Sequence, residues 1–162
     1  MKQIEGSVCA AKGFTANGIY CGIRKRNDKN DLALIFSKVP AHAAAVYTTN
    51  LVKGAPLTVT KQHIADGIAQ AVICNSGNAN TCNSNGIEIA EQMSALAAEK
   101  LGIKAEDVVV ASTGVIGQKL NITPIADGMD SLAEGLSENG DEEAAKAIMT
   151  TDTVMKKNCG GI

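Results

Sequence analysis

Residues 107–117 read Asp-Val-Val-Val-Ala-Ser-Thr-Gly-Val-Ile-Gly and constrain the fold more than any other stretch of the chain. Three consecutive valines predict a strand buried on both faces, and the Ser-Thr-Gly sequence after them predicts a tight turn. This turn presents the Thr113 hydroxyl and backbone N–H groups at a fixed point, where they can stabilise a developing negative charge. Because no evident nucleophile paired with a base accompanies the turn, we expect the chain to be part of a catalyst.

Composition narrows the class of protein. The 162 residues fit one domain, residues 1–162, and the net charge of −2 with 2% aromatic residues argues against a nucleic-acid partner. The five cysteines form no Cys-x-x-Cys pair and only two histidines accompany them, so we expect reduced thiols, no metal site and a cytoplasmic location. No apolar run approaches the ~20 residues of a membrane helix, so a membrane partner is not expected.

Strands dominate the first half of the chain in this interpretation. The segments with strand character are 18–25, 31–39, 44–49, 57–60 and 71–74. The polar residues 26–30 suit a hairpin loop, which predicts an antiparallel start, and a short helix is expected over 61–66. The polar residues 75–80, Asn-Ser-Gly-Asn-Ala-Asn, predict a turn or a site loop at the end of the last strand.

Helices dominate the second half. The clearest one shows apolar residues at three- and four-residue spacing, with Asn85 as the expected cap and Gly102 just beyond the end; its apolar positions are Ile89, Met93, Leu96, Ala97 and Leu101. A second helix is predicted to begin at Thr123-Pro124, and a third to cover 142–148 with Asp141 as cap. Together these elements predict an α/β (α+β) fold with a mixed sheet that contains an antiparallel hairpin and is covered by helices.

Several side chains have both a structural and a functional interpretation. Thr113 and Gly114 either cap and turn the backbone or form a pair of donors. The polar residues of 75–80 either hold their own loop or lie beside a substrate. Cys74 is either a core residue or a nucleophile, although apolar surroundings raise the pKa of a thiol. Thr150, after the last predicted helix, either belongs to a capped helix end or binds an amino-acid substrate.

Several motifs in order carry a resemblance to a known family. They include Ala-Val-Ile-Cys-Asn-Ser-Gly-Asn-Ala-Asn over 71–80, Ser-Thr-Gly-Val-Ile-Gly over 112–117 and Ile-Met-Thr-Thr-Asp-Thr over 148–153. Shorter ones lie at 11–14, 31–36, 45–48 and 55–56. With these motifs the chain resembles, almost from end to end, the ArgJ family of ornithine acetyltransferases, also called glutamate N-acetyltransferases, which serve arginine biosynthesis. The resemblance implies a DmpA/ArgJ-like fold.

The resemblance also implies a division of the enzyme into two chains. Members of the family are precursors that cleave themselves into α and β chains, and the new N-terminal threonine of the β chain is the nucleophile. This sequence is similar to an α chain, with the Ala-Thr cleavage motif expected beyond Ile162, and alone it is expected to be inactive. The implied partner is the β chain, in an α2β2 heterotetramer.

By the same resemblance, Thr113 and Gly114 match the oxyanion-hole pair and Thr150 matches a substrate-binding threonine. The implied reaction moves the acetyl group of N-acetylornithine to glutamate through an acetyl-threonine intermediate, without a cofactor. Use of acetyl-CoA as a co-substrate, which would make the enzyme bifunctional, is left open by the sequence. The alternatives are a hydrolase that depends on Cys74 and a non-catalytic binding subunit.

Overall fold

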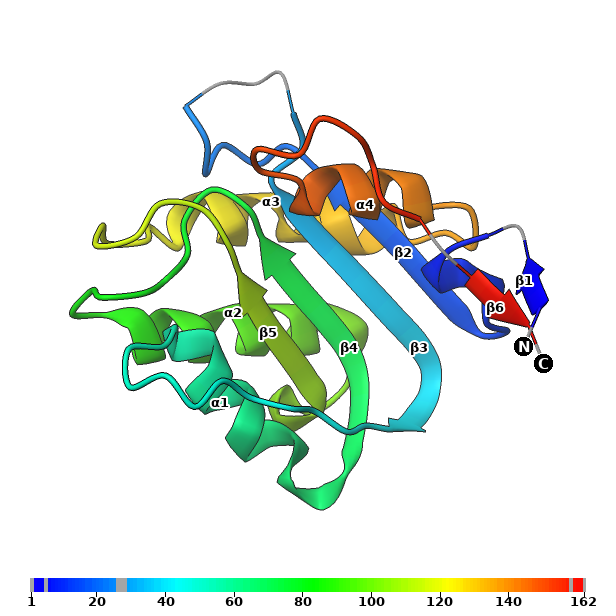
Figure 1. The fold of residues 1–162 in the computed structure, drawn as a ribbon, viewed down its shortest axis with the longest axis horizontal. Coiled ribbons are helices and arrows are strands. Elements are labelled where there is room, and N and C mark those ends of the chain that lie inside the picture. Colours follow the sequence, from blue (N-terminus) through cyan, green and yellow to red (C-terminus); the bar gives the residue numbers. More distant parts are fainter. Residues whose placement is uncertain (1, 5, 26–28, 158, 162) are drawn as a thin grey trace.

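The computed structural model describes residues 2–4, 6–25, 29–157 and 159–161 (Figure 1). Its strands are β1 (Lys2–Ile4), β2 (Phe14–Ile19), β3 (Leu32–His42), β4 (Ile68–Asn75), β5 (Val108–Ser112) and β6 (Cys159–Gly161). Its helices are α1 (Ala55–His63), α2 (Gly86–Leu101), α3 (Thr123–Glu134) and α4 (Asp141–Ile148). Single 3₁₀ turns cover Val8–Ala10, Ile64–Asp66 and Ala105–Asp107.

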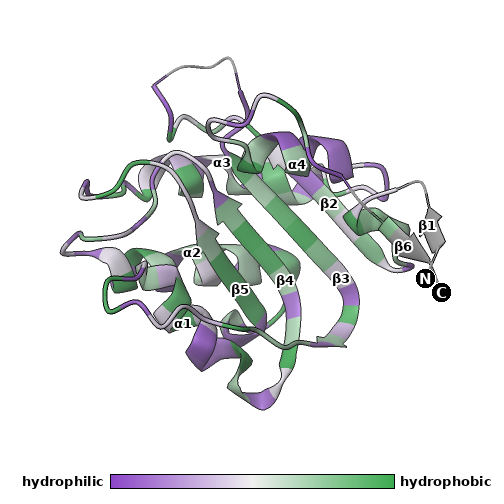
Figure 2. Ribbon diagram, viewed as in Figure 1, coloured by the Kyte–Doolittle hydropathy of each residue, from purple (hydrophilic) through white to green (hydrophobic). Residues whose placement is uncertain are grey.

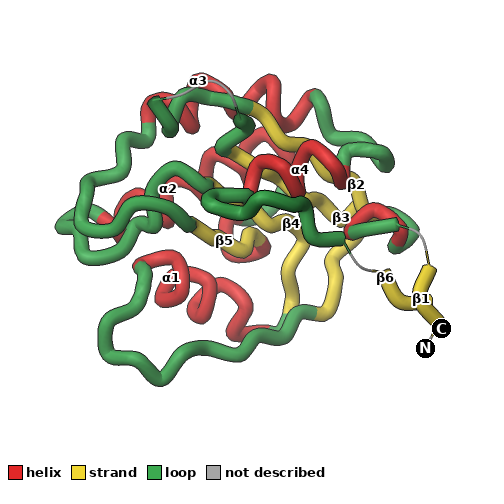
Figure 3. Tube along the Cα trace, turned by 45° about the horizontal axis from the view of Figure 1, so that its top comes forward, coloured by secondary structure: helices red, strands yellow, loops and turns green. Residues whose placement is uncertain are grey.

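The main sheet is mixed. Its four strands lie in the order β2-β3-β4-β5, with β3 antiparallel to both β2 and β4, and β4 parallel to β5. This arrangement confirms the predicted α/β (α+β) fold with an antiparallel hairpin and covering helices. A separate two-stranded antiparallel sheet joins β1 to β6, and Figure 3 shows this pair beside the main body, next to both chain ends.

The larger core lies between one face of the sheet and helices α1, α2 and α3. Alternate residues of the strands point into it, as the period of two in a strand requires. Its fully buried side chains include Leu32, Leu34, Ile73, Val108, Met93, Ile125, Met129 and Leu132. Burial of such a side chain contributes about 1.5–3 kcal/mol, so this layer provides most of the hydrophobic stabilisation.

Helix α4 packs on the opposite face, across β2 and β3, and the approach is close. The buried contacts there are small residues: Ala16, Ala33, Ala144 and Ala147. A Cβ atom added to Gly18 would lie 2.1 Å from the carbonyl oxygen of Glu143, so only glycine fits where the helix crosses β2. The small residues therefore set the distance between α4 and the sheet.

The rest of this second face has no helix over it within the described residues. Figure 1 shows α4 across β2 and β3, with no described helix lying across β5 and most of β4 on that side. We define the open sheet face as Val72, Val109 and Ala111 of β4 and β5 together with Ile35 of β3, which borders the contact with α4; all four are half-buried. Figure 2 shows hydrophobic residues along these strands, although one face is exposed. A sheet in this arrangement normally packs a second layer against such a surface.

The sequence-based prediction was wrong over 44–49 and 57–60, which form no strand. Residues 57–60 lie in α1, where Pro56 occupies the first turn and favours a helix start. The Thr60 hydroxyl donates to the Val110 carbonyl at 2.9 Å and accepts from the Val110 N–H at 3.0 Å. These contacts and the full burial of Val59 outweigh the strand preference of β-branched residues. The helix expected over 61–66 is the end of α1 followed by a 3₁₀ turn.

The prediction at 18–25 was also wrong for most of its length. Only Gly18 and Ile19 lie in a strand, β2, which runs from Phe14 to Ile19. Beyond it the Asp31 carboxylate accepts from the N–H groups of Cys21 and Arg24, which a partner strand would otherwise bond. Part of the loop expected at 26–30 lies outside the described residues. Helices α2, α3 and α4 occupy the predicted segments. Asn85 is the N-cap of α2 but makes no side-chain capping bond, and the N-cap of α4 is Gly140, with the expected cap Asp141 as the first helical residue.

None of the described helices is long and apolar enough to cross a bilayer.

The close approach of α4 to β2 predicts a strong response to a single methyl group. We expect Gly18→Ala to lower the free energy of unfolding by about 2 kcal/mol, because the added Cβ would collide with helix backbone that can move only as a unit. Chemical denaturation measures this effect. Ser131→Ala, on the exposed side of α3, is the control, and equal stability of the two variants would contradict the packing argument.

Candidate functional site

The candidate site lies where the parallel strands β4 and β5 end. The last residues of the two strands, Asn75 and Ser112, are paired in register, so both chains leave the sheet at the same edge. Ligands of open α/β sheets commonly bind outside the carboxyl ends of parallel strands, where turns expose backbone groups. The predicted Ser-Thr-Gly turn therefore lies at a position suited to binding.

Asn75 holds this edge together and is fully buried. Its side-chain N–H donates to the Ser112 hydroxyl at 2.7 Å, and its side-chain oxygen accepts from the N–H groups of Gly77 and Asn78 at 3.2 and 3.1 Å. Its backbone carbonyl accepts from the Thr113 N–H at 2.9 Å. One residue thus fixes both the end of β5 and the loop after β4, as the polar motif at 75–80 suggested.

Thr113 and Gly114 follow this anchor. Gly114 has a φ of 130°. A Cβ there would lie 2.6 Å from the carbonyl carbon of Gly77, so the turn needs glycine for both its conformation and its close packing. In the described part of the chain, neither the Thr113 hydroxyl nor the Gly114 N–H has a protein hydrogen-bond partner. The turn therefore combines a rigid backbone with two donors that remain available.

The neighbouring asparagines support the far side of the turn. Asn78 donates to the Gln118 carbonyl at 3.0 Å, and Asn83 donates to the same carbonyl at 3.2 Å. Asn80, fully buried, donates to the Gly86 carbonyl at 2.8 Å and accepts from Asn83 at 2.9 Å. These contacts agree with the structural interpretation of the loop, in which its amides hold the backbone of 113–118 against 75–80.

Thr150 lies beyond the end of α4 and is half-buried. Its N–H points to the Asp152 carboxylate at 3.4 Å, and a hydrogen bond from Lys156 lowers the pKa of Asp152. The carbonyl of the preceding residue, Met149, accepts a hydrogen bond from the Arg24 guanidinium. The segment after α4 is thus tied to the loop after β2.

The structure brings the predicted site residues to one region without direct contact between them. Gly114 packs on the backbone of Gly77. The neighbouring Ser76 donates a hydrogen bond to the Ala147 carbonyl near the end of α4. Arg24 binds both the Ser76 hydroxyl and the carbonyl of Met149, the residue before Thr150. Sequence reasoning missed Arg24, because its partners lie 52 and 125 residues away and no local pattern marks it.

Neither histidine is positioned as a base for this turn. The ring of His63 is buried between α1, α2 and β5, where Nδ1 lies 2.9 Å from the Val108 carbonyl and Nε2 lies 3.3 Å from Glu91. Val108 begins β5, at the opposite end of the strand from the turn. His42 lies at the end of β3 and lines a hollow on the open sheet face.

Cys74 lacks the features of a catalytic nucleophile. Its thiol makes a hydrogen bond to the Asn75 carbonyl at 3.7 Å, and burial raises the pKa of the thiol to about 11. A thiolate is therefore scarce at neutral pH. Among the described residues, no group of three or more His, Cys, Asp or Glu side chains is arranged to hold a metal ion.

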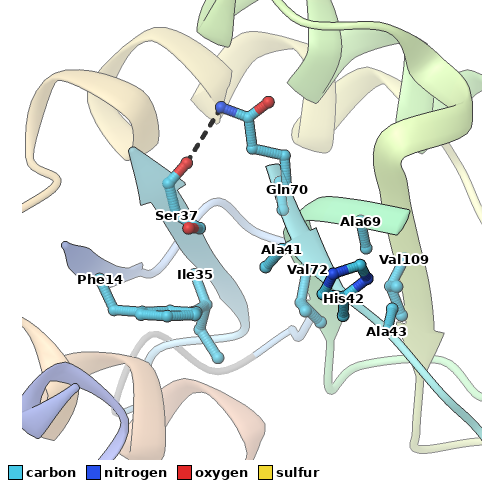
Figure 4. Close-up of a pocket in the computed structure, with 11 residues that line it drawn as sticks. Phe14, Ile35, Ser37, Ala41, His42, Ala43, Ala69, Gln70, Val72 and Val109 are labelled. Carbon is cyan, nitrogen blue, oxygen red and sulfur yellow. Dashed lines mark hydrogen bonds between the residues drawn. The ribbon is translucent and has the colours of Figure 1, made fainter. Parts of the chain in front are cut away.

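Two hollows lie on the face of the sheet that α4 partly covers, and Ile35 and Val72 line both of them. The one in Figure 4 has a volume of about 190 Å³ and is lined mainly by apolar side chains, among them Phe14 and Val109. Its polar rim includes Gln70, whose side-chain N–H donates to the Ser37 carbonyl at 3.1 Å. The hollow in Figure 4 lies on the open sheet face, whereas the second lies beside α4, where Ala33 and Ala144 line it. The lining of neither hollow includes Thr113 or Gly114.

Comparison with known proteins gives consistent matches. The model of the ArgJ family matches residues 15–160. The arginine biosynthesis bifunctional protein ArgJ of Caldanaerobacter subterraneus subsp. tengcongensis is 46% identical over 157 residues, and that of Symbiobacterium thermophilum is 47% identical over 159 residues. These alignments cover 96% and 97% of this chain but only 38% and 40% of the two relatives, so the chain spans about two fifths of their length.

Solved structures of similar proteins have the same fold. The crystal structure of arginine biosynthesis bifunctional protein ArgJ from Bacillus halodurans matches with a TM-score of 0.86 and 43% identity, over 94% of this chain and 81% of that chain. Ornithine acetyltransferase from Mycobacterium tuberculosis, solved in complex with ornithine, matches with a TM-score of 0.88 and 36% identity, over 94% and 84% of the two chains.

The raised pKa of Cys74 predicts slow thiol chemistry. At pH 8 a thiol with a pKa of about 11 is ionised to roughly one part in a thousand, and burial further limits access. We expect iodoacetamide to modify the exposed Cys82 at least about a hundredfold faster than Cys74. Peptide mapping by mass spectrometry measures both rates. Equal rates would restore Cys74 as a candidate nucleophile.

Proposed function

Because this chain belongs to the ArgJ family, we propose that it is the α chain of an N-terminal-threonine acetyltransferase in arginine biosynthesis. The proposed reaction moves an acetyl group from N-acetylornithine to glutamate. The observation that carries the proposal is the turn at Thr113 and Gly114, where a hydroxyl and an N–H lie free at the end of a rigid strand. These two residues match the family's oxyanion-hole pair.

The lengths of the relatives support a two-chain enzyme. The chain fills 81% of the solved chain from Bacillus halodurans but 38% of the curated relative from Caldanaerobacter. A family whose proteins consist of two polypeptides would give this difference. The proposal assigns the nucleophile to the second polypeptide, in agreement with the place of His63 at the far end of β5 and with the raised pKa of the Cys74 thiol.

The proposed chemistry uses an N-terminal threonine whose own α-amine takes the proton of its hydroxyl. The hydroxyl oxygen attacks the acetyl carbonyl of N-acetylornithine, and the resulting oxyanion accepts hydrogen bonds from the Thr113 hydroxyl and the Gly114 N–H. Collapse breaks the C–N bond, and ornithine leaves with the proton from the ammonium group. An acetyl ester remains on the threonine of the partner chain.

Glutamate completes the cycle. Its amine attacks the acetyl ester, a second oxyanion forms in the same pair of donors, and N-acetylglutamate departs as the threonine regains its proton. No cofactor is needed for these steps. Acetyl-CoA is an alternative acetyl donor in the bifunctional version of the proposal, and the name bifunctional protein, which the two relatives carry, supports including it in the assay.

Thr150 is proposed to bind the amino-acid part of the substrate. It is half-buried, it lies in the region of the Thr113 turn, and it matches a substrate-binding threonine of the family. The relative from Mycobacterium tuberculosis was solved with ornithine, which supports an amino acid of this class as ligand.

The open sheet face is the proposed docking surface for the partner chain. Ile35, Val72, Val109 and Ala111 present apolar surface beside the candidate site, and Ile148 nearby is 48% exposed. The three fifths of the relatives' length that this chain does not match would be enough polypeptide to supply a second layer. Two such α–β pairs would give the proposed α2β2 heterotetramer.

The decisive experiment is an acetyl-transfer assay. This chain is co-expressed with the polypeptide encoded immediately downstream, and the purified complex is given N-acetylornithine and glutamate, or acetyl-CoA and glutamate. Formation of N-acetylglutamate from the first pair supports the proposal, and formation from the second shows bifunctionality. A folded complex that transfers no acetyl group from N-acetylornithine would overturn it in favour of a non-catalytic subunit.

Loss of one oxyanion donor predicts a specific kinetic defect. We expect Thr113→Ala to lower kcat by about 10²- to 10³-fold with a smaller change in KM, because the hydroxyl acts mainly on the charge of the transition state. Thr113→Ser keeps the hydroxyl and is expected to retain most of the rate. Turnover of Thr113→Ala at the wild-type rate would remove the hydroxyl from the mechanism.

The same variant tests self-cleavage. The carbonyl of the cleaved peptide would become an oxyanion as the acetyl carbonyl does, so we expect the Thr113→Ala precursor to mature more slowly. Gel analysis of the two products follows this maturation. Cleavage of the Thr113→Ala precursor at the normal rate would show that self-cleavage does not use the Thr113 hydroxyl.

A charge on the open sheet face predicts loss of assembly. We expect Val109→Asp to weaken association with the partner chain by about a hundredfold or more, because the carboxylate would be buried without a partner. Val39→Asp, at a valine that is 65% exposed, is the matched control. Co-purification and analytical ultracentrifugation measure the association. Unimpaired assembly of Val109→Asp would move the interface elsewhere.

A further inference from the structure

Arg24 connects three segments that are distant in sequence. Its Nε donates to the Ser76 carbonyl at 3.1 Å, and its Nη2 donates to the same carbonyl at 2.9 Å and to the Ser76 hydroxyl oxygen at 2.7 Å. The same Nη2 also donates to the carbonyl of Met149. The guanidinium therefore bridges the loop after β4 and the end of α4.

The backbone of Arg24 is itself fixed. The fully buried carboxylate of Asp31 accepts from the Arg24 N–H at 2.9 Å and from the Cys21 N–H at 2.8 Å. The Asp31 carbonyl accepts from the Ser76 N–H at 2.9 Å. The guanidinium thus starts from an anchored backbone, which reduces the conformational entropy lost in making its contacts.

The contacts of Arg24 reach both predicted parts of the site. Ser76 precedes Gly77, whose backbone packs against Gly114, and Met149 precedes Thr150. The Ser76 hydroxyl also donates to the Ala147 carbonyl in the last turn of α4. A cation at a helix C-terminus is favoured by the partial negative charge there, so Arg24 stabilises this end of α4 as well.

We propose that Arg24 is a positioning residue, which sets the location of Thr150 relative to the oxyanion turn by tying the Met149 carbonyl to Ser76. This inference rests on the proposed function, since it concerns the binding of the same amino-acid substrate. Arginine suits the role because its planar guanidinium directs several donors at once, whereas lysine has one compact ammonium. Arg24 acts through Thr150 and touches no reacting atom.

The first test separates KM from kcat in the two-chain enzyme. We expect Arg24→Gln to raise the KM for N-acetylornithine by about tenfold and to change kcat by less than about twofold, because Asn75 still holds the oxyanion turn. Lys25→Gln removes the neighbouring exposed charge and is expected to leave both constants unchanged. An unchanged KM in Arg24→Gln would overturn the inference.

The second test is a double-mutant cycle. If Arg24 acts through Thr150, the Arg24→Gln substitution raises KM by less than about twofold when Thr150→Val is already present. In the Thr113→Ala background, Arg24→Gln raises KM by the same factor as it does in the wild type. A global loss of structure would multiply in both backgrounds and would overturn the inference. Thermal denaturation shows whether each variant is folded.

Ser76→Ala provides an independent variant if Arg24→Gln does not fold. It removes one acceptor of the guanidinium and the bond to Ala147, so it is expected to raise KM in the same direction. A Ser76→Ala enzyme with unchanged KM would count against the proposed link from Ser76 through Arg24 to the Met149 carbonyl. Failure of the proposed function is distinguishable from failure of this inference, because in that case the wild-type complex itself transfers no acetyl group.

Discussion

The architecture of the site depends on the hydrogen bonds of the buried Asn75 side chain. A strand that ends inside a protein leaves backbone donors and acceptors that must be satisfied, and an unsatisfied buried group costs about 1–3 kcal/mol. Asn75 satisfies the Ser112 hydroxyl and the N–H groups of Gly77 and Asn78 with one side chain, and its own carbonyl takes the Thr113 N–H. Both strand ends are therefore held in one rigid arrangement.

The uneven cover of the sheet shows how a chain with a well-packed core can still offer an apolar surface to the proposed partner chain. One face buries large side chains under three helices, whereas the other has α4 on β2 and β3 and an apolar surface on β4 and β5. The candidate turn continues directly from β5, so a second layer on the open sheet face would also border Thr113. Assembly and completion of the active site would then be the same event.

Local patterns predicted some of this structure, and tertiary contacts decided the rest. Helix α2 was predictable, because its apolar spacing and Gly102 are local signals, and so was the strand that leads into Thr113. Helix α1 was not, because its Thr58-Val59-Thr60 sequence favours a strand until Thr60 bonds to β5. The turn at Thr113 was predictable as a candidate site, but the roles of its residues came from family resemblance, since a threonine and a glycine in a turn are locally ambiguous. Arg24 carried no signal at all.

The arrangement of donors suits a reaction that forms two similar oxyanions in succession. A donor that must reorient for each one would add a cost to both steps, whereas the Gly114 N–H is part of a backbone packed against Gly77. The turn can therefore serve acylation and deacylation without moving. Substrate exchange between the two proposed steps would require adaptable contacts instead, and the proposal assigns these to Thr150, which follows α4 and the Met149 carbonyl that Arg24 binds. A rigid turn beside a separately anchored segment would therefore suit the proposed ping-pong transfer.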